Sequence, residues 1–284
     1  MMETEKDSVA VRMKHAAGAP IRVLDSLGEQ GAFYVRAVAW VYRALFRYKK
    51  EQVRLLAEVG MGSGALALIG GSVAITGFLT FFTGTNAGVQ AYQGLHQVDL
   101  TALSGFASAY VNTRLAAPII AGAGLAATVG TGITAQLGAM RINEEIDALE
   151  VMGVPSLPYL VTTRLIAGFI AIIPLYSLAI ILSYLGYKAV TVLFYDVSTG
   201  AYDHYFYTFL KPVDILYSFI QALAMAVVVI LVHTYHGYRA SGGPAGVGEA
   251  VGKAVRTSLI GVTTVNLAVA LAVYGGHDTL RISG

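Results

Sequence analysis

The chain has 284 residues, of which 56% are hydrophobic and only 13% are charged, and its formal net charge is +2. Its mean hydropathy of +0.64 lies outside the usual range of water-soluble domains and indicates an integral membrane protein. The basic residues gather at the edges of apolar stretches, which argues against nucleic acid as a partner, and the absence of cysteine excludes disulfides and thiolate metal sites.

The first 58 residues divide into two parts. Residues 1–20 lack the apolar core of a cleavable signal peptide, and we expect a flexible cytoplasmic N-terminus there. Residues 21–58 are expected to form an amphipathic helical region that lies in the membrane interface, with its basic face toward lipid phosphates. On a continuous helix one stripe would carry Arg36, Arg43, Arg47, Lys50 and Arg54, and the opposite side Tyr34, Val38, Val41 and Leu45. A helix of a small soluble domain is the alternative, although little other soluble sequence is available to pack against it.

Residues 59–284 are expected to form the membrane domain of an all-α protein. About five uncharged stretches are long enough to cross a hydrocarbon core of roughly 30 Å. They lie at Val59–Gly84, Leu115–Ala139, Leu165–Tyr187, Ile215–Val232 and Ser258–Tyr274. The second stretch is rich in Ala and Gly, which predicts close packing in the middle of the bundle. The Gly-rich segment Met61–Gly71 predicts a bend, and ordinary close packing explains it equally well.

The distribution of basic residues predicts the orientation in an inner (plasma) membrane. Lys and Arg are frequent before the first stretch and absent from residues 85–113, so the N-terminus is expected in the cytoplasm. With an odd number of spans, the C-terminus is expected on the periplasmic side. The aromatic segment Phe194–Leu210 would then lie on the outer side, as an interfacial belt or a short helix at headgroup level.

The segment Met140–Gly153 concentrates acidic residues between two apolar spans. An Asp at mid-bilayer costs about 2.5 to 3.5 kcal/mol, so this segment is expected to stay in water, on the cytoplasmic side. Gly153 and Pro155 are expected to end its helix. We expect a partner's groove to take the apolar ridge of Ile142, Ile146 and Leu149, and basic or amide groups of the partner to take the acids. A solvated surface helix is the alternative.

No constellation of residues predicts catalysis, a metal site or a bound cofactor. His233 and His236 could share a helix face, but no third ligand stands at a recognisable spacing, and interface anchors are the favoured interpretation. The segment Gly246–Ala254 departs from a phosphate-binding loop because Lys253 is followed by Ala and not by Ser or Thr. The spans contain almost no ionisable residues, and Arg114 is placed at an edge. This pattern disfavours an ion-coupled pump and favours an apolar cargo or an external energy source.

Three segments together resemble the MlaE/YrbE permease family, the membrane subunits of MCE-associated ABC lipid transporters. They are "EVGMGSGAL" (Glu58–Leu66), "FTGTNAGVQAYQ" (Phe82–Gln93) and "TAQLGAMRINEEIDALEVMGV" (Thr134–Val154). The N-terminal "GEQGAFYVRA" is similar to the B-type partner of paired mycobacterial-type permeases. The resemblance extends from about residue 55 to residue 276.

The resemblance implies a permease that works in a larger assembly. Its partners would be a second YrbE-type permease in a heterodimer, a cytoplasmic ABC ATPase dimer that holds the ATPase activity, and MCE proteins on the outer side, with lipids or fatty acids as cargo. The coupling helix that docks on the ATPase would contain Glu144, Glu145, Ile146, Asp147, Ala148, Leu149 and Glu150. Two other classes of function remain open: a stand-alone channel or carrier for apolar solutes, and a non-transporting membrane scaffold.

Overall fold

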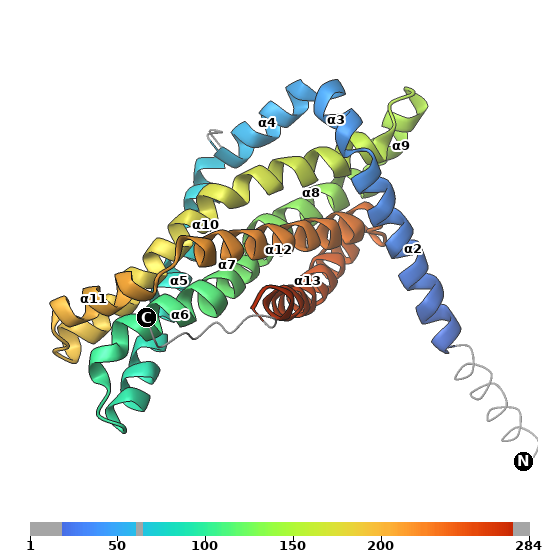
Figure 1. The fold of residues 1–284 in the computed structure, drawn as a ribbon. Helices are drawn as coiled ribbons and strands as arrows, with labels where there is room; N and C mark the ends of the chain where they lie inside the picture. The colour runs from blue at the N-terminus through green and yellow to red at the C-terminus, as the bar shows by residue number, and fades with distance from the viewer. Residues whose placement is uncertain (1–18, 61–64, 275–284) are drawn as a thin grey trace, which may run out of the picture.

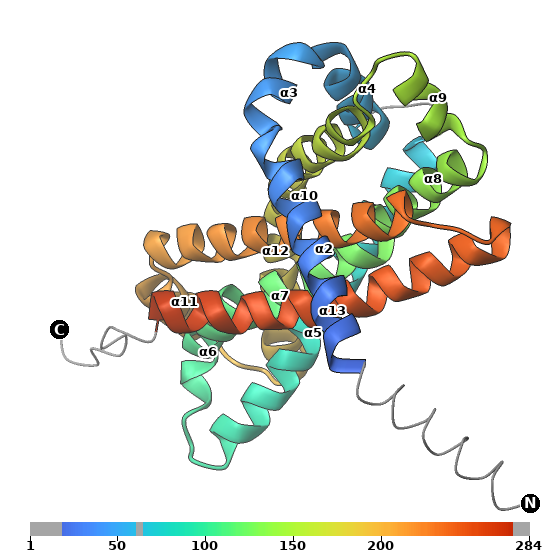
Figure 2. The same ribbon diagram turned by 90° about the vertical axis from the view of Figure 1, so that its right-hand side faces the viewer.

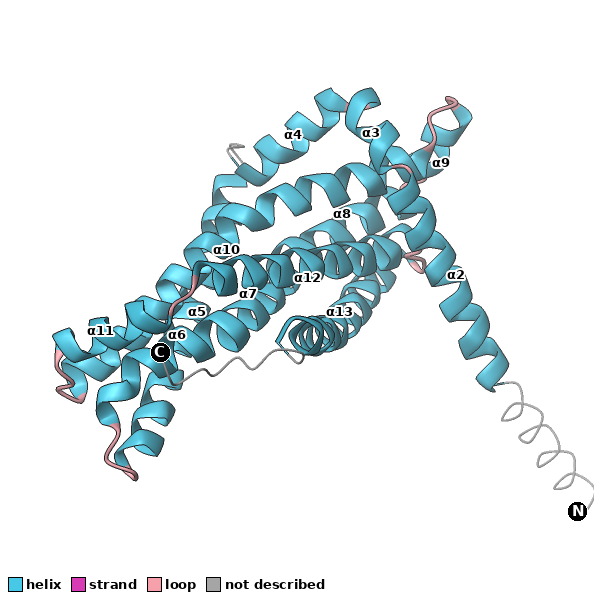
Figure 3. Cartoon of the chain, in the orientation of Figure 1, coloured by secondary structure: helices cyan, strands magenta, loops and turns pink. Residues whose placement is uncertain are grey.

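The computed structural model describes residues 19–60 and 65–274, and among these residues the chain is a bundle of helices (Figures 1 and 3). The N-terminal part consists of α2 (Ala19–Ala39), α3 (Val41–Arg47) and α4 (Lys49–Gly60). The helices α5 (Ala65–His96), α10 (Thr163–Ala189), α12 (Pro212–Tyr238) and α13 (Gly243–Tyr274) are the longest. The end of the bundle opposite α9 carries η1 (Thr101–Leu103), α6 (Ser104–Val111) and α11 (Thr199–Phe209). The helices α7 (Ala117–Leu125), α8 (Thr131–Ile142) and α9 (Glu145–Val151) complete the chain, joined by short π segments.

Four helical stretches in the described part of the chain are long and apolar enough to cross a membrane. They are Thr101–Ile142, Leu157–Phe194, Pro212–Tyr238 and Gly243–Tyr274, and they contain the second to fifth predicted spans. The prediction of an all-α membrane protein is therefore confirmed. The first predicted span falls mostly on α5, but residues 61–64, and part of the bend expected beside them, lie outside the described residues. The number of spans stays a prediction.

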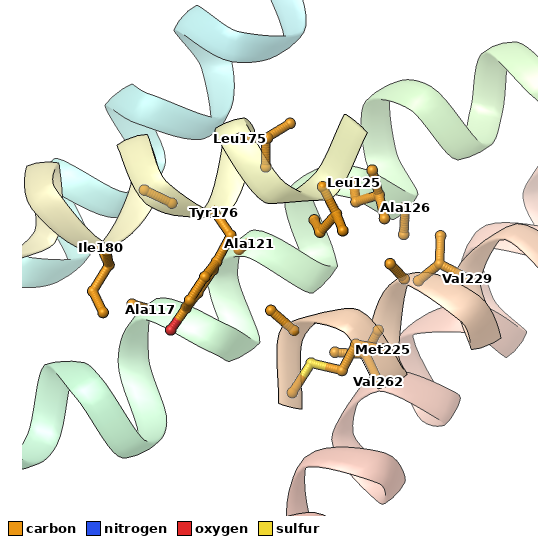
Figure 4. Packing of buried hydrophobic residues seen from close by; sticks show 14 residues of the cluster. Ala117, Ala121, Leu125, Ala126, Leu175, Tyr176, Ile180, Met225, Val229 and Val262 are labelled. Carbon is orange, nitrogen blue, oxygen red and sulfur yellow. The ribbon is translucent and has the colours of Figure 1, made fainter. Parts of the chain in front are cut away.

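Small residues allow the second span to sit in the middle of the bundle, as predicted. Ala117, Ala121 and Leu125 are buried against Tyr176 of α10 and Met225 of α12 (Figure 4). In lipid, close backbone approach and van der Waals contact replace the hydrophobic effect as the cause of helix association. The Ala-rich face of α7 provides that approach.

Four π turns belong to the two central spans, two of them inside Thr101–Ile142 and one at each end of Leu157–Phe194. They are η2 (Asn112–Ala116), η3 (Ala126–Gly130), η4 (Leu157–Thr162) and η5 (Val190–Phe194). A π turn holds one residue more than an α turn and is frequent at functional positions in helices. Two of them, η3 and η4, stand on either side of the segment that carries α9.

The N-terminal region is helical, but the single continuous helix on which the basic stripe depended is wrong. The helix breaks at Trp40 and at Tyr48, so that α3 and α4 curve over the N-terminal end of α10 (Figure 2). The carbonyl of Ala37, freed by the first break, accepts a hydrogen bond from Thr162 Oγ1 at 3.0 Å. At the second break, Gln52 Nε2 donates to the carbonyl of Ala44 at 2.8 Å. The Ala44 carbonyl also accepts the backbone N–H of Tyr48 at 3.0 Å, so at each break a side chain donates to a backbone oxygen of the preceding helix.

The breaks also change which side chains face the core. Phe33, Ala37 and Ala44 are buried, whereas Val38 and Leu45, expected on the apolar side, are exposed. Tyr34 and Val41 are half-buried. The five predicted basic residues are all exposed, distributed over three helices instead of one stripe.

Candidate coupling site

The acidic helix α9 lies at the opposite end of the bundle from α11 (Figure 1). The chain leaves α8 at Ile142 and turns sharply at Glu144, whose φ of 60° is left-handed. Gly153, with a φ of 74°, follows the helix, and glycine adopts this conformation without the steric cost that a side chain adds. The predicted end of the helix at Gly153 is therefore confirmed.

The apolar ridge of α9 is held by the chain itself. Ile146 is fully buried in a cluster that includes Phe33, Leu137, Leu160 and Ile230, and Leu149 packs against the same cluster. The expectation that a partner's groove would take this ridge is wrong for Ile146, because α8, α10, α12 and α2 already supply the groove. This packing fixes the direction in which the other face of α9 points.

Two of the four acidic side chains are engaged within the chain. Arg141 Nη1 forms an ion pair with Asp147 Oδ1 at 2.7 Å, which joins α8 to α9. Glu150 Oε1 accepts hydrogen bonds from Ser156 Oγ at 2.5 Å and from the Tyr238 hydroxyl at 3.3 Å. Tyr238 is the last residue of α12, so Glu150 ties the acidic segment to the end of that span.

The remaining face of α9 is exposed and combines charge with apolar surface. Glu144 and Glu145 are exposed and form no ion pair with any of the described residues. Beside them Val151 is 90% exposed and Met152 is 68% exposed. The sequence pattern does not distinguish these two apolar residues from core residues, although their position directly before Gly153 places them at the tip of the segment. The tip therefore offers two carboxylates and two apolar side chains to a partner.

His233 is a structural residue that joins three helices. It is fully buried, its Nδ1 lies 2.7 Å from Thr134 Oγ1 of α8, and its Nε2 lies 3.2 Å from Ser258 Oγ of α13. His233 therefore lies inside the bundle and is not an interface anchor. In the part of the chain that the structure describes, no group of three His, Cys, Asp or Glu residues could hold a metal ion.

The structure also reveals a buried ion pair that sequence reasoning missed. Arg114, expected at a span edge, is 7% exposed and donates from Nη2 to both carboxylate oxygens of Asp214, at 3.2 and 3.1 Å. The guanidinium lies over the rings of Tyr110 and Tyr274, at 4.2 and 4.4 Å from their centroids. The start of α12 and the end of α13 therefore meet α6 and η2 around the charge of Arg114.

A groove of about 720 Å³ runs along residues 79–91 of α5. Leu79 and Phe82 line it toward the middle of α5, and Asn86 and Gln90 line it toward the C-terminal end of that helix; Val111 of α6 also contributes. Gln90 Nε2 donates to Asn86 Oδ1 at 2.7 Å. The groove thus changes from apolar to amide-lined along one helix face.

Comparison with known proteins shows which proteins the sequence of this membrane domain resembles. The family described as permease MlaE matches residues 62–272. A probable ABC transporter permease protein of Rickettsia bellii is 28% identical over 242 residues, which are 84% of this chain and 89% of the relative. The intermembrane phospholipid transport system permease protein MlaE of Haemophilus influenzae is 26% identical over 246 residues, 83% of this chain and 91% of the relative. The chloroplastic protein TRIGALACTOSYLDIACYLGLYCEROL 1 of Arabidopsis thaliana is 25% identical over 201 residues, 70% of this chain and 57% of the relative.

Proposed function

The chain belongs to the MlaE permease family, and from this membership we propose that it is the membrane-spanning subunit of an ATP-driven lipid transporter. The names of its relatives, ABC transporter permease and intermembrane phospholipid transport permease, support this class of function. No phosphate-binding loop occurs in the sequence, so the ATPase activity is assigned to a separate cytoplasmic subunit.

The observation that carries the proposal is the two-sided construction of α9. Ile146 anchors the helix in the core of the permease, and Glu144, Glu145, Val151 and Met152 form the exposed tip. A docking surface needs an apolar centre and a polar rim, and this tip has both on a rigid support. We propose that the ATPase dimer grips the tip and that its nucleotide-driven movement passes through Ile146 to α8 and α10.

The cargo and the remaining partners follow from the same family. The groove of Leu79, Phe82, Asn86 and Gln90 supports a lipid whose chains lie along the apolar part and whose head group meets the amides. A second YrbE-type permease as a heterodimer partner, MCE proteins on the outer side, an inner-membrane location and a cytoplasmic N-terminus complete the proposal. Residues 1–20, 21–58 and 59–284 would then be the cytoplasmic terminus, the interfacial region and the permease domain.

The test is charge reversal at the tip, Glu144→Lys with Glu145→Lys, in the assembled transporter. We expect insertion into the membrane to be unchanged, while co-purification of the ATPase and ATP-dependent lipid transfer are lost. Glu249→Lys, at the exposed start of α13, is the matched control and should leave both intact. Unchanged ATPase co-purification and transport in the double variant would reject the docking proposal, and transport by the permease alone without nucleotide would establish a stand-alone carrier.

A further inference from the structure

The break at Trp40 creates an exposed elbow, residues Trp40–Lys50, that combines aromatic and basic side chains. Tyr42 is 75% exposed and Phe46 is 63% exposed. Arg43, Arg47, Lys49 and Lys50 are exposed as well, and the segment Val41–Lys50 contains no acidic residue. Arg43 lies 5.3 Å from the centroid of the Trp40 ring, and Lys49 lies 5.7 Å from that of Phe46.

A hollow of about 640 Å³ opens between the elbow and the segment that follows α9. Trp40, Arg43, Phe46 and Arg47 line one side of it, and Pro155 lines the other. A second hollow of about 710 Å³ shares Trp40 and Pro155, and adds Arg36 and Arg239. Trp40 is therefore shared by two adjoining hollows. The first is lined by two arginines and by no acidic residue of the described part of the chain, whereas Glu150 also lines the second and Arg239 there is paired with Glu29.

This surface fits one class of ligand. Among the described residues, Arg43 and Arg47 form no ion pair, and exposed aromatic rings lie beside them. Aromatic and basic side chains together suit the boundary between acyl chains and phosphates better than they suit bulk water. The arginines can bind a phosphate through paired N–H groups, and Tyr42 and Phe46 can cover the glycerol and the upper acyl carbons. A zwitterionic lipid gains less, because its ammonium group meets the same cations. A small soluble anion would leave the rings uncovered.

We propose that the elbow is a binding site for an anionic phospholipid of the cytoplasmic leaflet, with the phosphate at Arg43 and Arg47. The proposal depends on the proposed topology only for naming the leaflet, and it is independent of transport. Because Pro155 belongs to the segment between α9 and η4, a bound lipid would contact the connection that holds the acidic helix in place. The lipid composition of the leaflet would then influence that connection.

Trp40 makes the site directly observable, because it is the single tryptophan of the chain. The experiment uses the full chain, purified without an ATPase, in phosphatidylcholine nanodiscs that contain increasing fractions of dibrominated phosphatidylglycerol. Bromine quenches tryptophan fluorescence on contact. We expect dibrominated phosphatidylglycerol to reach half-maximal quenching at a mole fraction on the order of tenfold lower than dibrominated phosphatidylcholine does. This mole fraction should rise with salt concentration, because salt screens the attraction between the arginines and the anionic lipid.

Three variants separate charge from structure. Arg43→Gln with Arg47→Gln should abolish the preference for the anionic lipid, whereas Arg43→Lys with Arg47→Lys should keep most of it. Lys253→Gln with Arg256→Gln removes the same charge from α13 and should leave quenching unchanged. Equal helix content and equal elution volume of the variants would establish that each one is folded.

Two results would overturn the proposal. The first is equal quenching by the two brominated lipids, or an unchanged preference in the Arg43→Gln, Arg47→Gln variant. The second is displacement of the lipid by millimolar glycerol phosphate, which would assign the site to a soluble anion. Since no ATPase is present, either failure would leave the proposed transport function untouched, and a loss of transport in the α9 tip variants would leave this site untouched.

Discussion

Arg114 and Asp214 lie 100 residues apart in the sequence, yet one guanidinium nitrogen of Arg114 donates to both carboxylate oxygens of Asp214 inside the bundle. Removing one member of a buried pair leaves the other charge without compensation, at a cost of about 3 to 5 kcal/mol. We therefore expect Asp214→Ala to lower the thermal stability of the purified permease strongly. Thermal unfolding in detergent would measure the loss.

The double variant Arg114→Met, Asp214→Leu provides the control for this first prediction. Replacing both charges with apolar side chains removes the desolvation cost together with the attraction. The double variant should therefore be more stable than Asp214→Ala and close to the unmodified protein. A double variant as unstable as Asp214→Ala would mean that the ion pair is not the cause.

The second prediction separates the two faces of α9. Ile146→Ala should lower stability by roughly 2 to 4 kcal/mol, because it opens a cavity in the core. Val151→Ala should leave stability within about 0.5 kcal/mol, because this side chain is 90% exposed, but should weaken ATPase binding. Thermal unfolding and co-purification of the ATPase would measure the two effects. Equal behaviour of the two variants in both assays would contradict the assignment of faces.

The third prediction concerns Tyr238, whose hydroxyl lies 2.7 Å from Ser156 Oγ and bonds to Glu150. Tyr238→Phe should cost about 1 kcal/mol and loosen the connection between α9 and α12. We expect fewer lipids moved per ATP hydrolysed, with ATPase binding retained. Tyr207→Phe is the matched control, because Tyr207 is 72% exposed on α11. An unchanged transport ratio in the Tyr238 variant would exclude a role in coupling.

The fourth prediction concerns His233, which joins α8, α12 and α13. His233→Ala should cost on the order of 2 to 4 kcal/mol, because it leaves a cavity and removes the imidazole that contacts both Thr134 Oγ1 and Ser258 Oγ. His233→Asn should lose less, since an amide can replace one of the two hydrogen bonds. His204→Ala, at an exposed position of α11, should have little effect. Thermal unfolding of the three variants would measure these losses of stability. A loss for His204→Ala as large as that for His233→Ala would contradict the prediction.

The membrane-crossing helices could be predicted from the sequence because their signal is local. A run of uncharged residues such as Ile215–Val232 has no stable place outside the membrane or a core, whatever surrounds it. The end of α9 was equally local, since Gly153 favours a left-handed backbone.

The breaks at Trp40 and Tyr48 could not be predicted, because the residues around them are not helix breakers. The bonds that hold the breaks come from Thr162, on another helix, and from Gln52, beyond the second break. The burial of Ile146 and of the Arg114–Asp214 pair depends on contacts between distant segments in the same way. A sequence pattern identifies a helical face, but only the fold decides what covers it.

The π turns η3 and η4 have a mechanical consequence. The segment between them consists of α8, α9 and the loop with Pro155. The acidic helix α9 is therefore connected to the rest of the bundle through a π turn on each side. A π turn contains one residue more than an α turn, and such turns are frequent at functional positions in helices. We therefore expect a force that a partner applies to α9 to act first on these two π turns, before it reaches the α-helical turns that pack the core.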